Sequence, residues 1–149
     1  MTLLINILDD PLSAEFASLA EAAEGEGYAH IRRLVDEWAS GTNRFDKAGE
    51  KLLCVHDDTS LIAVGGINHE FSRSDWLRMR RFYVLPEHRG NGVARLLATM
   101  LIEHAREHTT TITVHAGLHA GDERAGRFWQ AMGFRPFARE SYTHILEFS

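Results

Sequence analysis

The sequence has little of what cross-links a chain or holds it in a membrane. Its 149 residues include one cysteine, Cys54, which cannot form an internal disulfide and fits a reducing compartment. Cys54 stands in the apolar run 52–55, which favours a buried packing residue over a nucleophile. No segment approaches the roughly 18 to 20 apolar residues that cross a bilayer. We therefore expect a cytoplasmic protein without a membrane partner.

Repeats, low-complexity tracts and proline-rich linkers are lacking too. The chain has only three prolines, and its 44% hydrophobic and 25% charged residues are the usual balance of a globular domain. The apolar start runs into Asp9 and Asp10 without a preceding basic residue, which predicts a first strand rather than a secretory signal. We expect residues 1–149 to form one domain.

Charge is unevenly distributed along the chain. The formal net charge of −5 argues against a nucleic-acid partner. Residues 1–58 hold twelve acids and five bases, whereas residues 73–95 hold six arginines and two acids. An arginine-rich stretch in an acidic chain indicates either a local anion site or a solvated charged face.

Hydrophobic periodicity and turn residues predict a mixed α/β (α+β) sheet with helices packed on its faces. The expected order is β-α-α-β-β-β-α-β-α-β. Helices are expected from a cap at Ser13 to about 25, and over 28–40, 93–108 and 122–132. Strands are expected over 2–8, 51–56, 61–67, 77–84, 111–115 and 143–148.

The most informative segment is 82–94, in which a strand leads through a glycine-bearing loop into an amphipathic helix. Glycines permit left-handed backbone and leave room for a ligand, while the first turn of a helix attracts phosphate. Arg89 adds a cation with a forked donor pattern. These features predict a site for a diphosphate.

Two common phosphate motifs do not fit this loop. The ATPase type requires a Lys-Ser/Thr pair that the sequence lacks. The dinucleotide type requires a small residue where Arg95 stands. A third pattern, R-x-x-G-x-G/A, is met by Arg89, Gly92 and Ala94.

With this pattern the sequence resembles the GNAT superfamily of acyl-CoA-dependent N-acetyltransferases. The wider segment 84–97, VLPEHRGNGVARLL, is more specific than the glycines alone. A second block, AGRFWQAMGF at 125–134, is similar to the family pattern A-x-x-[LF]-Y-x-x-x-G-F. The element order also matches, so the resemblance covers nearly the whole chain and is strongest over 77–134.

The resemblance implies acetyl-CoA as the co-substrate and no metal. Backbone N–H groups of the loop, with Arg89, would hold the pyrophosphate, and the main chain of Phe82 and Val84 would pair with pantetheine. The N–H near Val84 would stabilise the oxyanion that forms when an amine attacks. The implied cofactor-binding residues are Phe82, Tyr83, Val84, Arg89, Gly90, Asn91, Gly92, Val93, Ala94 and Asp122.

The catalytic residues are less defined, because two positions depart from the family pattern. Trp129 stands where the family usually has a tyrosine that protonates the leaving thiolate, so it either faces the thiol or only packs. The strand 77–81 holds arginines where many relatives have a basic glutamate. The remaining candidates for the base are Glu70, His69, His115 and His119.

Arg78 and Arg80 are expected to share one strand face with Phe82 by alternation. They could contact a carboxylate on the acceptor, or they could be surface strand arginines. The pattern H-x-x-E-H from His104 to His108 matches a zinc-protease motif. It lies in the last turn of a helix, where the dipole favours histidines anyway, so we expect no metal there.

The implied function is transfer of an acetyl group from acetyl-CoA to an amine by direct attack in a ternary complex. The acceptor is expected to be a small amine, an amino acid or a peptide. Two alternatives remain open: a non-catalytic CoA-binding sensor, and a transferase of a longer acyl group. Whether the chain forms a homodimer also remains open.

Overall fold

A computed structural model describes residues 2–117 and 123–149, so Asp122 and His119 lie outside the described residues. The strands are β1 (Leu4–Ile7), β2 (Lys51–His56), β3 (Leu61–His69), β4 (Leu77–Val84), β5 (Thr111–Val114), β6 (Arg135–Pro136) and β7 (His144–Glu147). The helices are α1 (Ala14–Gly25), α2 (His30–Ser40), the short 3-10 helix η1 (Pro86–His88), α3 (Val93–Arg106) and α4 (Arg124–Ala131).

The predicted element order and mixed fold class are confirmed, with one strand added. β6 has two residues and pairs with β7, and it is too short to produce a periodic signal. Ser13 caps α1 as predicted, since its Oγ accepts the N–H of Phe16 at 3.1 Å. Gly41 ends α2 in the left-handed conformation.

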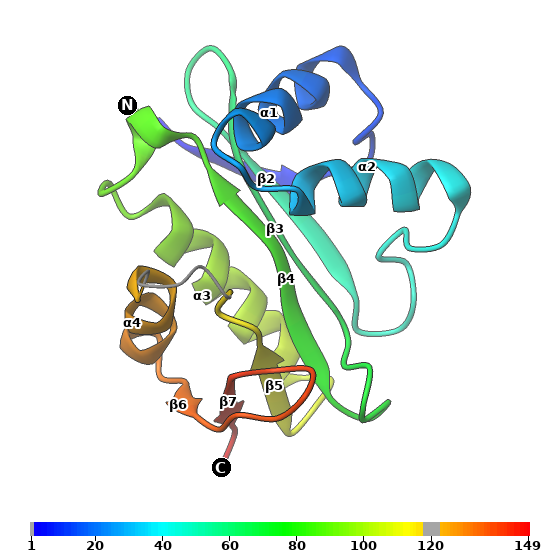
Figure 1. Ribbon diagram of the computed structural model, residues 1–149, viewed down its shortest axis with the longest axis vertical. Coiled ribbons are helices and arrows are strands. Elements are labelled where there is room, and N and C mark those ends of the chain that lie inside the picture. The colour runs from blue at the N-terminus through cyan, green and yellow to red at the C-terminus, as the bar shows by residue number, and fades with distance from the viewer. Residues whose placement is uncertain (1, 118–122) are drawn as a thin grey trace.

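The strands form one sheet in the order β1-β2-β3-β4-β5-β7-β6. β4 and β5 pair parallel, whereas the other neighbouring strands pair antiparallel. Helices α1 and α2 cover one face of this sheet, and α3 and α4 cover the other (Figure 1). We call these the α1/α2 face and the α3/α4 face.

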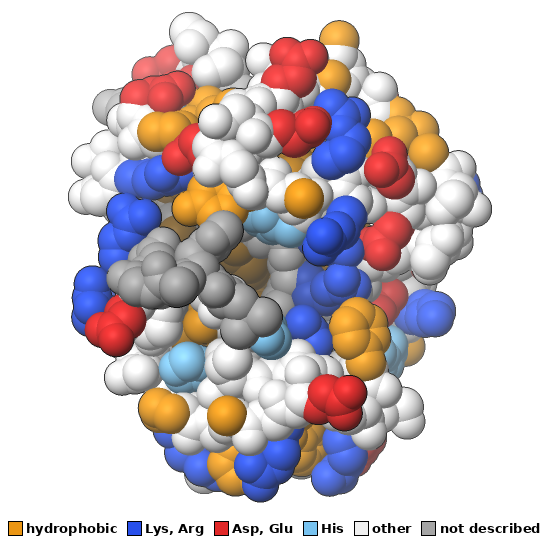
Figure 2. Space-filling view, in the orientation of Figure 1, with side chains coloured by type: hydrophobic (Ala, Val, Ile, Leu, Met, Phe, Trp, Pro, Cys, Tyr) orange, Lys and Arg blue, Asp and Glu red, His pale blue; other side chains and the backbone are white. Residues whose placement is uncertain are grey.

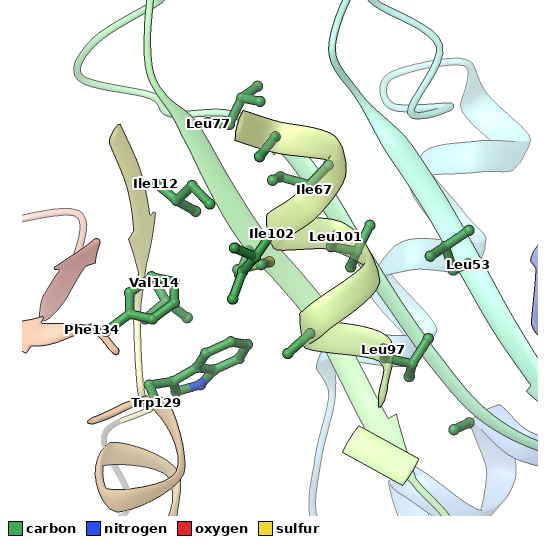
Figure 3. Packing of buried hydrophobic residues seen from close by; sticks show 14 of the residues in the cluster. Leu53, Ile67, Leu77, Leu97, Leu101, Ile102, Ile112, Val114, Trp129 and Phe134 are labelled. Carbon is green, nitrogen blue, oxygen red and sulfur yellow. The ribbon is translucent and has the colours of Figure 1, made fainter. Parts of the chain in front are cut away.

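Each face has its own hydrophobic core. On the α3/α4 face, Leu97 and Leu101 of α3 pack over the strands on one side of the helix, and Trp129 of α4 packs on the other side (Figure 3). The α1/α2 face buries Phe16 and Leu34 against the opposite side of the sheet. Removing this apolar surface from water, at about 25 cal/mol per Å², is the main force that holds the layers together.

The sequence pattern of α3 predicts a buried stripe of Val93, Leu96, Leu97, Met100, Leu101 and Ala105, and the structure differs from it in part. Met100 is 46% exposed, while Ala98 and Ile102 are buried. The helix therefore turns a face centred on Leu97 and Leu101 toward the sheet, and Met100 lies at its edge.

Cys54 is buried within β2, as predicted. Burial and the nearby carboxylates of Glu15 and Asp9 raise the pKa of its thiol to about 11. The thiol is therefore protonated at neutral pH and is a poor nucleophile.

Candidate active site

The site begins where β4 and β5 separate. Their pairing joins Leu77 to Ile112 and ends with Met79 opposite Val114. In the described part of the chain, β5 pairs with no β4 residue beyond Met79, and the two strands diverge in Figure 1. The second half of β4 therefore has an open edge inside the molecule.

The main chain of Phe82 and Val84 points toward this open edge. Tyr83 pairs with β3, and the Leu85 N–H donates to Ile62 O at 2.9 Å, so the alternate residues must face away from β3. An extended ligand could add there as a strand, as expected for pantetheine.

Both carbonyl groups on that edge already accept a hydrogen bond from a side chain. His30 Nε2 donates to Phe82 O at 2.7 Å, and Arg89 Nε donates to Val84 O at 3.0 Å. A ligand strand would therefore meet carbonyls that are partly satisfied, and each has one lone pair left.

A β-bulge interrupts β4 at this point. Tyr83 and Arg80 keep their partners on β3, but two residues, Arg81 and Phe82, lie opposite the single residue Gly65. Arg81 has a φ of 64°, the left-handed region that residues with a Cβ seldom adopt. The bulge reverses the alternation of side chains along the rest of the strand.

The reversal corrects the expectation that Arg78, Arg80 and Phe82 share a face. Phe82 lies on the α3/α4 face, with its ring centroid 5.0 Å from that of Trp129. Arg81 lies on the α1/α2 face, where its Nη2 donates to Glu37 Oε1 of α2 at 2.8 Å. The β4 side chains on the α1/α2 face are Arg78, Arg80, Arg81 and Tyr83.

The glycine loop has the geometry that its sequence predicts. Gly90 and Gly92 both have a φ of 81°, and a side chain at either would meet no atom within 4 Å. Gly92 is the N-cap of α3, and the first N–H bonded within the helix is that of Leu96. The N–H groups of residues 93–95 thus lack intrahelical acceptors beside an open space, which suits an anion.

Comparison with known proteins identifies this arrangement. The model of the acetyltransferase (GNAT) family matches residues 12–134. The chain belongs to this family.

Solved structures of GNAT acetyltransferases have the same fold. A candidate acetyltransferase from Exiguobacterium sp. 255-15 is 24% identical, with a TM-score of 0.86 over 99% of this chain and 94% of that one. A GNAT acetyltransferase from Staphylococcus aureus Mu50 is 12% identical, with a TM-score of 0.77 over 99% and 100% of the two chains. A candidate acetyltransferase from Salmonella typhimurium, solved with its cofactor acetyl-CoA, is 17% identical, with a TM-score of 0.71 over 100% and 95%. Among curated proteins no significant match is found.

Arg89 of the glycine loop is held by Glu26, the residue that caps the end of α1. Its guanidinium forms two hydrogen bonds with the Glu26 carboxylate, at 3.0 and 2.7 Å, and these bonds lower the pKa of Glu26. The Tyr83 hydroxyl also donates to Glu26. The Tyr83 ring is buried on the α1/α2 face, so its link to the cofactor loop runs through Glu26 and Arg89.

The other loop residues differ in exposure. Asn91 is exposed beside the two glycines, whereas the Val93 side chain packs in the core of the α3/α4 face. Val93 and Ala94 can therefore contribute their main-chain N–H groups to a ligand, and Val93 also anchors the start of α3.

Trp129, at the position of the GNAT tyrosine, is a core residue. It is 5% exposed, and its ring lies against those of Phe82, Phe128 and Phe134 at 4.9 to 5.3 Å (Figure 3). This aromatic cluster fills the space below the separation of β4 and β5. Packing is therefore one established role of Trp129.

Glu70 does not suit the role of base. Its side chain is fully buried and accepts hydrogen bonds from Ser72, Thr113, Ser141 and Arg78. Burial alone would raise the pKa of Glu70, but these hydrogen bonds and the charge of Arg78 together lower it. The carboxylate is enclosed and ties the end of β3 to β5 and to the loop before β7, which leaves it less suited to the role of base than an accessible histidine.

The described histidines among the candidate bases differ in how many of their ring nitrogens already have a hydrogen-bond partner. His69 has both ring nitrogens 2.9 Å from carbonyl oxygens, those of Ser74 and Ala48. His115, after β5, accepts the Gly117 N–H on Nδ1 at 3.2 Å. Burial and the charge of Arg78 lower the pKa of His115, so it is neutral at pH 7. Its remaining ring nitrogen then carries the proton.

His30, the first residue of α2, was not found from the sequence. Its bond to Phe82 O places Nε2 as the donor and leaves Nδ1 able to accept a proton. Burial, together with the charges of Arg81 and Arg33, lowers its pKa. No motif marks this residue, because 52 positions separate it from Phe82.

The described residues contain neither a group of metal-ligating side chains nor a membrane-spanning helix. Within residues 2–117 and 123–149, no three His, Cys, Asp or Glu side chains are grouped to hold a metal ion. The His104 and His108 rings lie 4.6 Å apart, and His104 Nε2 is 3.1 Å from Gly49 O. None of the helices in the same ranges has the length and apolar character needed to cross a membrane.

Proposed function

We propose that this protein transfers the acetyl group of acetyl-CoA to an amine. One observation carries the proposal: the open edge of β4 leads directly into a loop with two left-handed glycines and free helix N–H groups. A strand-like pantetheine and its diphosphate require these two features side by side. The acetyl-CoA complex of the Salmonella typhimurium relative supports the choice of cofactor.

The residues of this chain would divide the binding as follows. Main-chain N–H groups over 90–94 hold the diphosphate, and Arg89 keeps the loop against Val84. The main chain of Phe82 and Val84 aligns the ligand along the open edge, and the N–H near Val84 stabilises negative charge on the carbonyl oxygen under attack. Asp122 remains a predicted pantetheine contact. Acetyl-CoA supplies the activated acetyl group, and alignment of the two substrates supplies much of the rate.

For the proton of the attacking amine, we propose His30 as the acceptor. It is neutral at pH 7, it is bonded to the edge where the reaction would occur, and its Nδ1 is the nitrogen that can take a proton. His115 is the second candidate. The departing thiolate takes a proton from water unless Trp129 is replaced by a residue that can donate one.

The burial of Trp129 favours one other function, a sensor that binds acetyl-CoA without transfer. A GNAT domain that lacks the usual tyrosine and the usual basic glutamate could retain the cofactor site alone. The two functions share every prediction about binding and differ only in the release of CoA thiol. A cytoplasmic location is proposed for either.

Binding is tested with Gly92→Glu, which places bulk and negative charge where the diphosphate would lie. Gly41→Glu is the matched control, because Gly41 is also exposed with a φ of 81° but caps α2 away from the loop. We expect acetyl-CoA to raise the Tm of the wild type and of Gly41→Glu, and to leave the Tm of Gly92→Glu unchanged. An equal rise in all three would place the ligand elsewhere.

Transfer is tested by measuring thiol release from acetyl-CoA over a panel of amines. Release that depends on an amine supports the acetyltransferase. Binding without release, in the presence of any amine of the panel, supports the sensor. A longer acyl-CoA that reacts faster than acetyl-CoA would show that the acyl group was misassigned.

A further inference from the structure

One arginine on β4, Arg80, has no carboxylate in contact with its guanidinium among residues 2–117 and 123–149. Arg80 is half-buried, and within the described residues its guanidinium forms no hydrogen bond or ion pair. It lies against the ring of Phe71, with Cζ 4.9 Å from the ring centroid. Glu37 and Glu50 act on it only through space. Burial, with the charges of Arg81 and Arg78, lowers the pKa of Arg80 to about 10.

Its two arginine neighbours are only partly satisfied. Arg78 binds Glu70 and Ser141 O, and Arg81 binds Glu37, yet each keeps a buried Nε–H without an acceptor in the described part of the chain. Leaving a buried donor unpaired is costly, so such groups point to a missing partner. Three guanidinium groups here share two bonded carboxylates, and one negative charge would complete the cluster.

The cluster lies beside the proposed reaction site. Arg80 directly follows Met79, the last β4 residue paired with β5, and only the bulge residue Arg81 separates it from Phe82. In the view of Figure 2, basic side chains gather beside the central hollow of the surface, over the middle of β4. Phe71, 66% exposed, covers the guanidinium groups of Arg78 and Arg80 from outside.

We propose that Arg80, supported by Arg78 and Arg81, binds the carboxylate of the acceptor, so that the acceptor is an amino acid. This inference rests on the proposed acetyl transfer. A carboxylate is the anion that matches one uncompensated charge, and arginine can bind its two oxygens together. Since the arginine lies within about two residues of the attack site, amine and carboxylate belong to the same small molecule. The β-bulge makes this possible, because it keeps Arg80 and Arg81 on one face.

The test compares amino acids with two matched sets of amines. One set lacks the carboxylate, and the other carries a phosphonate in its place. For the wild type, we expect kcat/KM to be at least tenfold higher for the amino acids than for either set. In Arg80→Gln, kcat/KM for amino acids should fall by about ten- to a hundredfold, while the plain amines and the KM for acetyl-CoA change little.

Arg73→Gln is the matched control, because Arg73 also lies over an aromatic ring, that of Trp76, but is exposed and bound to Asp75. It should behave as the wild type. Arg80→Gln should unfold at the same Tm as the wild type or higher, since it removes an uncompensated charge. A lower Tm with equal losses for all acceptors would show that Arg80 is structural and overturn the inference.

A second measurement separates this inference from the proposed function. Calorimetric binding of N-acetyl amino acids needs no turnover. If binding depends on Arg80 and no amine is acetylated, the carboxylate site stands and the proposed function fails. If acetylation occurs but neither binding nor kcat/KM depends on Arg80, the carboxylate site fails alone. A higher kcat/KM for the phosphonates than for the amino acids would show that the site is built for a doubly charged anion, and would overturn the assignment of a carboxylate.

Discussion

The two faces of β4 are built in different ways. On the α3/α4 face, Phe82 packs against Trp129, and the proposed cofactor contacts come from backbone: an open strand edge, two glycines and the start of a helix. On the α1/α2 face, long charged side chains from distant segments meet, as in the pair of Arg81 with Glu37. The proposed cofactor site thus depends mainly on chain geometry, and the proposed acceptor site depends mainly on charge.

His30 lies on the α1/α2 face and donates a hydrogen bond to Phe82 O at the open edge of β4, where the reaction would occur. Its substitution should therefore have the largest effect on turnover. In His30→Gln, kcat should fall by about a hundredfold at pH 7.5, since general base catalysis is lost while an amide can still donate to Phe82 O. Because the pKa of His30 is lowered, the wild-type kcat should fall with acidity only below about pH 6.5. This acid limb should disappear in the variant, and a pH series of kcat measures it.

His115→Gln is the control for that experiment. It should keep the acid limb and most of the activity. If the acid limb of kcat is lost in His115→Gln and kept in His30→Gln, the proton acceptor is His115 at the end of β5. The catalytic base would then not lie on the α1/α2 face.

Glu26→Gln breaks the connection between the two faces. We expect the KM for acetyl-CoA to rise about two- to fivefold with little change in kcat, because Arg89 loses the carboxylate that holds it against Val84. Glu24→Gln is the matched control: Glu24 also forms a bond with an arginine, Arg32, at 2.8 Å, but on the outer side. A lower KM in Glu26→Gln would mean that the freed arginine turns to the phosphates.

Trp129→Tyr should have the smallest kinetic effect and sharpens the account of the apolar face. The smaller ring leaves space among Phe82, Phe128 and Phe134 and buries a hydroxyl, so we expect the Tm to fall by about 2 to 4 °C for each kcal/mol lost. Turnover should change less than threefold. A several-fold gain, with a changed alkaline limb of the pH profile, would show that position 129 faces the thiol.

The sequence was sufficient for features written in neighbouring residues. The glycine loop, the cap at Ser13 and the order of the main elements depend on local turn and helix signals, and the structure has them as predicted. The burial of Cys54 follows from the apolar run around it. Backbone-built features are predictable because few residue types can adopt the required conformation.

The features that escaped prediction join residues far apart or shift the register. Glu26 and Arg89 are 63 positions apart, and nothing local links them. The bulged strand itself has no glycine or proline at this point, since Arg81 takes the left-handed conformation; Gly65 lies opposite it on β3, but the sequence alone does not show that the two segments pair there. The prediction of strict alternation along the strand therefore placed Phe82 on the wrong face. Charged sites assembled across the fold need the tertiary structure before their partners can be named.

The bulge at Arg81 also has a consequence for redesign of the protein. Because alternation reverses there, positions 78 and 80 belong to one binding surface and position 82 to the other, although all three are even-numbered on one strand. Libraries that vary 78 and 80 should explore new acceptors while the aromatic cluster around Trp129 is kept. Deleting one residue at the bulge should instead exchange the two surfaces along the rest of β4, with loss of both. Strand length, at this one position, is a more restrictive parameter for an engineer than the choice of any single side chain nearby.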